Sequence, residues 1–197
     1  PNKNPFDMFL DYPEPFVPRY LTLPVKERIN AEGGVDTPLD EEAVKAQTLK
    51  LKGYNVEAIA VCFLWSTVNP AHEQRAAELI HEVWPDVTVV LSSEVNPSNR
   101  EYRRWVSAAM DASLRKLISS YANDLNGRLN DAGFVGKVGM LNAAGGVMST
   151  NEIVNRPLYS VDSGPSMAPV AGRKYAEDDL GEQNAVVLDM GGTTFDV

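Results

Sequence analysis

The sequence predicts an α/β fold, because short apolar runs typical of strands alternate along the chain with segments typical of helices. The strand-like runs cover residues 56–65, 87–91, 137–141 and 185–188. Turns that contain glycine follow strand-like segments at residues 142–147, 162–166 and 189–194. Ligands of α/β folds gather where strands end and helices begin, so these turns are the first candidates for a binding site.

Residues 1–38 are rich in proline and aromatic side chains. Proline blocks a continuous helix and lacks the N–H group that a strand ladder needs, so we expect an extended connector with one strand around residues 21–30. Residues 31–38 should form a turn, in which Gly33 and Gly34 suit a positive φ.

The first predicted helix covers residues 39–54, with acidic residues in its first turn and with Lys50 and Lys52 before a C-cap at Gly53. A second helix covers residues 69–85, with Asn69 as N-cap and Pro70 at its first position.

The pattern of residues 98–130 is helical for a long way, because large apolar residues recur at spacings of three and four. We expect this stripe to pack into the core; its members are Trp105, Met110, Leu114, Leu117, Tyr121 and Leu125. Further along, the sequence predicts a short helix at residues 149–155, a strand and then a turn at 157–166, and a helix at 167–175.

Composition excludes several classes of protein. Hydrophobic residues make up 44% of the 197 residues and charged residues 23%, which is typical of a globular chain. A net charge of −9 argues against a nucleic-acid partner, which needs clustered Lys and Arg. No stretch approaches the roughly 20 apolar residues that cross a membrane, and the opening residues show neither an initiator Met nor a signal segment.

The single cysteine, Cys62, excludes an internal disulfide and fits a reducing cytoplasm. Because it lies in an apolar run without an evident base, we expect it to be buried and unreactive. Two histidines, His72 and His81, cannot form a zinc site by themselves, and we expect them on a helix surface or at an interface.

The sharpest motif is DMGGTT at residues 189–194. Asp189 follows an apolar run and could hold a hydrated Mg²⁺ ion. The two glycines would let the backbone approach a phosphate, and the two threonines could donate hydroxyl hydrogen bonds. Phe195 and Val197 alternate with Asp196 as in a returning strand, so we expect a β-hairpin with Gly191 or Gly192 at positive φ. An ordinary hairpin without a ligand is the alternative.

The other two turns, NAAGGV and DSGPS, are individually more typical of ordinary turns than of ligand loops. Gly164 and Pro165 nevertheless lead directly into a helix, whose free N–H groups could face an anion. A cluster of charged residues at 100–104 is either a solvated helix start or an arginine pair that meets an anionic substrate.

Together these residues resemble the A subunit of the hydantoinase/oxoprolinase family, which includes N-methylhydantoinase, 5-oxoprolinase and the ATP-dependent carboxylases of acetone and acetophenone. The resemblance spans essentially the whole chain, because eight motifs occur in the order of that family. They are PFVPR (15–19), PLDEEAV (38–44), NPAHEQR (69–75), LSSEV (91–95), REYRR (100–104), AAGG (143–146), SGP (163–165) and DMGGTTFDV (189–197).

The resemblance implies a fold similar to the actin, Hsp70 and sugar-kinase ATPases, in which a mixed sheet with flanking helices forms each of two lobes around a nucleotide. By this resemblance the chain is an interior piece of a larger two-lobed protein. Residues 1–38 would be the extended connector, residues 39–180 the α/β portion of the first lobe, and residues 181–197 the start of the second lobe with its phosphate hairpin.

The resemblance further implies ATP with Mg²⁺ or Mn²⁺ as cofactors, Asp189 as the metal ligand, and an oligomer that contains a B-type partner subunit. The residues implied at the nucleotide are Asp189, Gly191, Gly192, Thr193, Thr194, Asp196, Gly145, Gly146, Ser163 and Gly164. Since the first-lobe hairpin lies outside this sequence, we do not expect the isolated chain to hydrolyse ATP.

Three functions stay open at this point. The first is phosphorylation of a carbonyl oxygen of a small molecule for hydrolysis of a cyclic amide. The second is ATP-dependent carboxylation of a ketone, which Phe195 favours because the commonest family motif, GGTSTDV, has threonine there. The third is a nucleotide-binding scaffold without catalysis.

Overall fold

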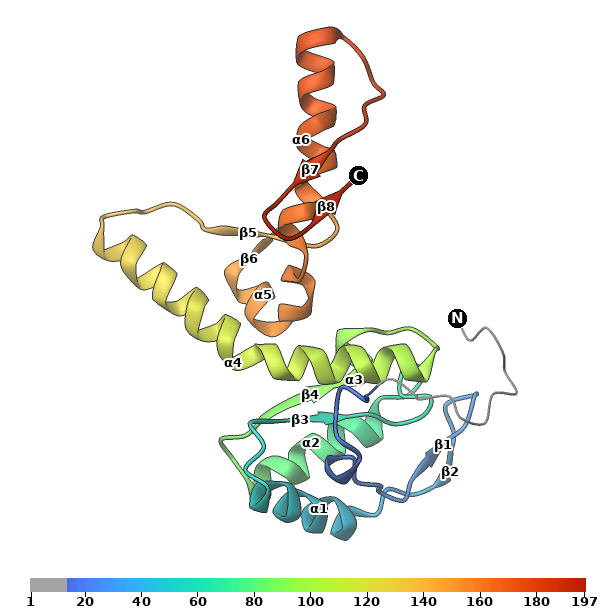
Figure 1. Ribbon diagram of the computed structural model, residues 1–197. Coiled ribbons are helices and arrows are strands. Elements are labelled where there is room, and N and C mark those ends of the chain that lie inside the picture. Colours follow the sequence, from blue (N-terminus) through green and yellow to red (C-terminus); the bar gives the residue numbers. More distant parts are fainter. Residues whose placement is uncertain (1–13) are drawn as a thin grey trace.

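In the computed structural model, which describes residues 14–197, one long helix joins two groups of elements (Figure 1). This helix, α4 (Glu101–Asp131), is 31 residues long. The α/β fold is confirmed, but the strands form four separate sheets of two strands each. Within residues 14–197, no helix is both long and apolar enough to cross a membrane.

The first group is built around two parallel strands, β3 (Ala58–Val61) and β4 (Thr88–Leu91). They are connected through α2 (Ala71–Val83), which also packs against α1 (Glu41–Gly53). Both strands lie within predicted runs, although β3 is shorter than residues 56–65. Both helices were predicted; Asp40 caps α1 by accepting from the Ala43 N–H, and Tyr54, not Gly53, is its C-cap.

The parallel strands are apolar because both of their faces are covered. One face packs on α1 and α2 in a cluster that includes Ile59, Val61, Leu79 and Leu91. The other face packs on α4, where the side chains are small. Ala58 and Ala60 of β3 meet Ala108 and Ala112 of α4 there, together with Val90 and Val95. Helix α3 (Ser92–Val95) follows β4 directly.

The N-terminal connector contains a hairpin that the sequence did not predict. After the 3-10 helix η1 (Arg19–Leu21), strand β1 (Arg28–Ile29) pairs with β2 (Val35–Thr37), so the expected turn is shorter than residues 31–38. The positive φ predicted there is confirmed at Gly33, where it is 85°. Residues 1–13 of the expected connector lie outside the described residues.

The second group begins with the hairpin of β5 (Gly139–Leu141) and β6 (Val147–Ser149). Helix α5 (Thr150–Asn155) confirms the predicted short helix. Its capping box joins Ser149 and Glu152, and hydrogen bonds from the Ser149 N–H and hydroxyl lower the pKa of the Glu152 carboxyl. The chain ends with η2 (Pro157–Ser160), α6 (Ser163–Leu180), β7 (Asp189–Met190) and β8 (Phe195–Asp196).

Two predicted strands of this group are wrong. The strand expected within residues 157–166 is the 3-10 helix η2 followed by the start of α6, because Pro157 fixes the first turn and the Leu158 N–H donates to Asp111 on α4. Residues 185–188 have no partner strand and form a loop, in which Val186 and Leu188 are 80% and 64% exposed. An apolar run becomes a strand only where a neighbouring strand can pair with it.

The α4 stripe is also placed differently from the prediction. The buried residues of α4 are Arg104, Ala108, Asp111, Ala112 and Ala122, whereas no member of the large apolar stripe is buried. Leu117 is 65% exposed and Tyr121 is 55% exposed. The space between α4 and the parallel strands admits only alanine-sized residues, so the periodicity correctly predicted a helix and incorrectly predicted its buried face.

Candidate functional site

The DMGGTT motif forms the predicted β-hairpin. In its register Asp189 lies opposite Asp196 and Met190 opposite Phe195, and the Gly191 N–H donates to the Thr194 carbonyl at 2.9 Å. Neither Gly191 nor Gly192 has a positive φ, so that part of the prediction is wrong. Four residues join β7 to β8, and hairpin loops of this length are most often built around a type I turn, whose central residues have negative φ.

Asp189 and Asp196 are both exposed, and their pairing places them on the same face of the hairpin. Directly opposed like charges destabilise a strand pair, and a divalent cation held between two carboxylates removes that repulsion. Within residues 14–197, no group of three His, Cys, Asp or Glu side chains is arranged to hold a metal. The hairpin therefore presents two exposed carboxylates on one face.

The NAAGG turn connects β5 to β6 and is organised by Asn142. Its side-chain oxygen accepts from the Ala144 N–H at 2.9 Å and from the Gly146 N–H at 3.1 Å. Gly145 has a φ of 77°. A Cβ atom there would lie 3.2 Å from the side chain of Val170 on α6, so glycine is needed for close approach as well as for the turn.

This turn meets the start of α6, as the prediction of a shared site requires. The Ser166 hydroxyl lies 3.1 Å from the Asn142 carbonyl oxygen. Ser163 and Gly164 form the first turn of α6, whose N–H groups have no partner inside the helix. A side chain added at Gly164 would meet no atom within 4 Å, which leaves room for a ligand. Most of the turn expected at residues 162–166 is therefore the first turn of α6. Asp162 precedes the helix, and its backbone is left-handed with a φ of 57°.

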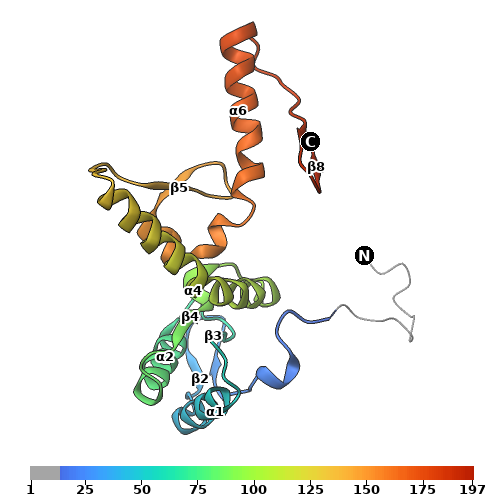
Figure 2. The ribbon, with the colours of Figure 1, turned by 60° about the vertical axis from the view of Figure 1, so that its left-hand side comes forward.

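The ten predicted site residues fall into two clusters. Gly145, Gly146, Ser163 and Gly164 lie together, whereas Figure 2 shows the hairpin of residues 189–196 on the other side of α6 from β5. No hydrogen bond among the described residues joins the hairpin to the first cluster. The connection is the preceding loop, in which Val187 packs against Gly172 of α6.

Residues of three sequence motifs meet in a buried polar network that the sequence did not predict. Glu73 accepts from the Phe63 N–H at 2.9 Å, from the Ser92 hydroxyl at 2.6 Å, and from the Ser93 N–H and hydroxyl at 3.0 and 2.8 Å. Arg104 donates to the Ser92 hydroxyl at 3.0 Å, to the Ser98 carbonyl at 2.8 Å and to the Phe63 carbonyl at 2.7 Å. Glu73, Ser92 and Arg104 are each 0% exposed.

The REYRR cluster had two interpretations, a solvated helix start or an arginine pair that meets a substrate. The network shows that Arg104 fits neither. Arg104 faces inward and ties α4 to the carboxyl ends of β3 and β4, so it cannot meet a substrate. Arg100, Tyr102 and Arg103 are exposed. A charged residue four positions before Ala108 and eight before Ala112, on the small-residue face of the helix, was the only sequence signal of this role.

The remaining candidates are structural. Cys62 follows β3 and is half-buried, not fully buried as predicted; desolvation raises the pKa of its thiol to about 12, which favours the protonated and less reactive form. His72 is buried and not on the surface as expected; its Nδ1 lies 2.8 Å from the Glu27 carboxylate. His81 contacts the Val87 carbonyl at 3.2 Å.

Two models of known families match this chain. The hydantoinase/oxoprolinase N-terminal region matches residues 1–84, and hydantoinase/oxoprolinase matches residues 104–197. The chain belongs to the hydantoinase/oxoprolinase family. Family relatives include the caprolactamase subunit alpha of Pseudomonas jessenii, 34% identical over 92% of this chain and 26% of the relative. The acetophenone carboxylase gamma subunit of Aromatoleum aromaticum is 37% identical over 94% of this chain and 26% of the relative.

Solved structures of the family agree with the fold. The ATP-dependent caprolactamase of Pseudomonas jessenii has a TM-score of 0.85 and 33% identity over 96% of this chain and 27% of that one. Nucleotide-free acetone carboxylase has a TM-score of 0.79 and 27% identity over 94% of this chain and 26% of that one. This family member therefore spans about a quarter of the length of these relatives.

Proposed function

We propose that this chain is part of an ATP-dependent subunit that activates the carbonyl oxygen of a cyclic amide by phosphorylation, so that water can open the ring. The observation that carries the proposal is the hairpin with opposed Asp189 and Asp196, in a chain whose fold is similar to an ATP-dependent caprolactamase. The amide nitrogen donates its electrons to the carbonyl and makes it unreactive, and transfer of a phosphoryl group to the oxygen removes this obstacle.

The proposed nucleotide site combines both clusters. Asp189 and Asp196 would hold Mg²⁺ or Mn²⁺, and the backbone of Gly191 and Gly192 with the hydroxyls of Thr193 and Thr194 would contact phosphate oxygens. Gly145, Gly146, Ser163 and Gly164 would offer N–H groups from the NAAGG turn and the start of α6. Bound ATP supplies the phosphoryl group, and the residues of this chain position it and neutralise its charge.

A second candidate function is ATP-dependent carboxylation of a ketone. It is favoured by the 37% identity to the acetophenone carboxylase gamma subunit and by Phe195, which removes one hydroxyl from the motif. Both functions require an activated carbonyl oxygen, so the phosphate site would be the same and the substrate pocket would differ. Because the relatives are named as subunits, we also propose a B-type partner subunit within an oligomer. The single cysteine is the ground on which we propose a cytoplasmic location.

The test is ATP turnover by the full-length protein with its partner subunit, measured as ADP or AMP release with caprolactam, 5-oxoproline, hydantoin and acetophenone plus bicarbonate. Turnover that depends on a cyclic amide supports the first function, and turnover that depends on both acetophenone and bicarbonate supports the second. Nucleotide binding without turnover of any substrate would instead indicate a scaffold.

Substitution of Asp189 tests the site itself. We expect Asp189→Ala to abolish turnover and leave the melting temperature within about 2 °C, because the Asp189 side chain is exposed and makes no hydrogen bond or ion pair within residues 14–197. Glu182→Ala, an exposed acid in the preceding loop, is the matched control and should keep full activity. Normal activity of Asp189→Ala would disprove the site.

A further inference from the structure

A second concave region lies on the inner face of α4, beyond the end of the parallel strands and away from the turns described above. It is a pocket of about 510 Å³ between α4, the start of β4 at Thr88 and the end of α5 at Asn155. The region is largely open to solvent. Val154 is its only apolar lining residue, although this face of α4 packs into the core one turn earlier.

Arg115 dominates this pocket, and the rest of the molecule holds it in place. Its Nε donates to Asp111 at 2.9 Å, and Asp111 is 0% exposed and also accepts from the Leu158 N–H. A structural arginine–carboxylate pair usually engages two nitrogens of the guanidinium. Here only Nε is used, and within residues 14–197 neither terminal nitrogen has a hydrogen-bond acceptor.

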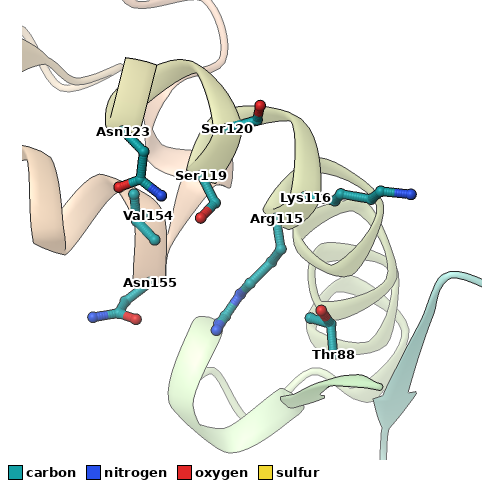
Figure 3. Close-up of a pocket in the computed structure, with 8 residues that line it drawn as sticks. All are labelled: Thr88, Arg115, Lys116, Ser119, Ser120, Asn123, Val154 and Asn155. Carbon is teal, nitrogen blue, oxygen red and sulfur yellow. The ribbon is translucent and has the colours of Figure 1, made fainter. Parts of the chain in front are cut away.

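Apart from Val154 the residues that line the pocket are polar and none of them is acidic; the acid at this guanidinium is Asp111, which lies behind it at Nε. In Figure 3 the Arg115 side chain extends into the space between Asn155 and Thr88, and Ser119 points to the same side. Asn123 lies one turn further along α4. Lys116 points away from Arg115 and pairs with Glu57 at 2.9 Å, so it is not a part of this constellation.

We propose that this pocket binds a small oxyanion, with Arg115 as its anchor. The two free terminal nitrogens of a guanidinium match the two oxygens of a carboxylate or phosphate group, and hydroxyl and amide groups at Ser119, Thr88 and Asn155 complete the shell. Asp111 holds the Arg115 guanidinium in place and leaves its two terminal nitrogens free. The Arg115 side chain therefore loses little conformational entropy when an anion binds. The pocket lies at the amino end of β4, opposite to the carboxyl ends of the strands.

The experiment is an NMR titration of the 197-residue chain with inorganic phosphate and, separately, with acetate, at constant ionic strength made up with chloride. We expect saturable shifts of the Arg115 Nε–H signal and of the backbone signals of Ser119 and Asn155 with at least one oxyanion. The arm that saturates at the lower concentration identifies the class of ligand.

Variants decide whether the pocket is responsible. Arg115→Lys keeps the charge but loses the fork, and we expect it to weaken binding at least tenfold. Ser119→Leu fills the pocket and leaves the Arg115–Asp111 pair in place, so it tests the site even if Arg115→Lys disturbs the fold. Arg128→Gln, which breaks an exposed pair with Asp124 on the same helix, should leave the titration unchanged. Shifts that never saturate, or that survive Ser119→Leu, overturn the proposal.

Discussion

Arg104 and Arg103 are neighbours in sequence with opposite roles. Arg104 is fully buried and satisfies two backbone carbonyls and Ser92, whereas Arg103 is exposed and forms no ion pair among the described residues. Removal of one partner from a buried charge network leaves the other groups without compensation. We expect Arg104→Ala to lower the free energy of unfolding by about 3–5 kcal/mol, measured by urea denaturation.

Arg103→Ala is the matched control for this substitution. Surface substitutions usually change the free energy of unfolding by less than about 0.5 kcal/mol. Equal effects of the two substitutions would mean that the network does not stabilise the fold.

Cys62 makes a specific contribution to pH dependence. Its pKa is raised from 9.0 to about 12, so the folded chain keeps the proton where the unfolded chain releases it. The stabilisation is complete below pH 9 and is lost as the pH rises toward 12, by up to about 1.4 kcal/mol per pH unit. We expect Cys62→Ala to unfold with a shallower pH dependence than the unchanged chain between pH 9 and 10.5, measured by urea denaturation. Identical slopes would contradict the raised pKa.

The sequence identified individual residues that carry chemistry better than it identified the residues that surround them. Asp189 and Asp196 could be selected because the DMGGTT spacing returns the chain on itself. Arg104 could not be separated from Arg100 and Arg103, because burial of one arginine depends on Glu73 and Ser92, which are distant in sequence and meet only in the fold.

The buried and exposed faces of α4 differ in the size of side chain that they accept. Ala108→Leu would force a large side chain against Ala58 and Ala60, and overpacking of this kind costs about 1–3 kcal/mol. Leu117→Gln changes an exposed residue and should alter the free energy of unfolding by less than about 0.5 kcal/mol. Urea denaturation of both variants tests the assignment, and the reverse order of effects would mean that the stripe is the buried face in solution.

Helices were easier to predict than strands because their signals are local. Asp40 before α1 and the pair Ser149 and Glu152 around α5 are caps that can be read within four residues. Strands require a partner, and residues 185–188 show that an apolar run without one is a loop. The returning strands β2 and β6 were missed because each begins directly after a pair of glycines, so that Val35 and Val147 were assigned to the predicted turns.

The β1–β2 and β5–β6 hairpins nevertheless share a sequence signal. The sequences NAEGG at residues 30–34 and NAAGG at 142–146 form the same turn, in which the asparagine side chain accepts from N–H groups two and four residues later. The first glycine of each has a positive φ, 85° at Gly33 and 77° at Gly145. Each turn also contacts residues at the start of a following helix, through Asn69 before α2 and through Ser166 in α6.

The molecule as a whole is far from compact. Its accessible surface is 13,637 Å², whereas a folded monomer of 21.6 kDa exposes about 9,200 Å². The second group contributes to this excess, because no residue of α6, β7 or β8 is buried. We expect a radius of gyration clearly above the roughly 16 Å of a compact chain of this length, measured by small-angle X-ray scattering; a value near 16 Å would show that the two groups close on each other.

Limited proteolysis distinguishes the two groups. Residues 132–138 join α4 to β5 and are exposed except for Val138, and residues 181–188 are similarly open. We expect the first cuts there, with residues 39–112 surviving because they contain both apolar clusters. Early cuts within α1 or α2 would contradict this order.

In the described part of the chain, residues 14–197, each of the four sheets has two strands, so every strand there has one side whose backbone N–H and C=O groups face no other strand of this part. Another chain can pair its own strand with such an unpaired edge. Electrostatic repulsion between two negatively charged copies opposes this association. With a net charge of −9 at pH 7 and a pI near 4.7, that repulsion vanishes as the solution is acidified and weakens as salt is added. The colloidal stability of the isolated chain is therefore governed by its charge, and fibre-like association should be fastest near its isoelectric point.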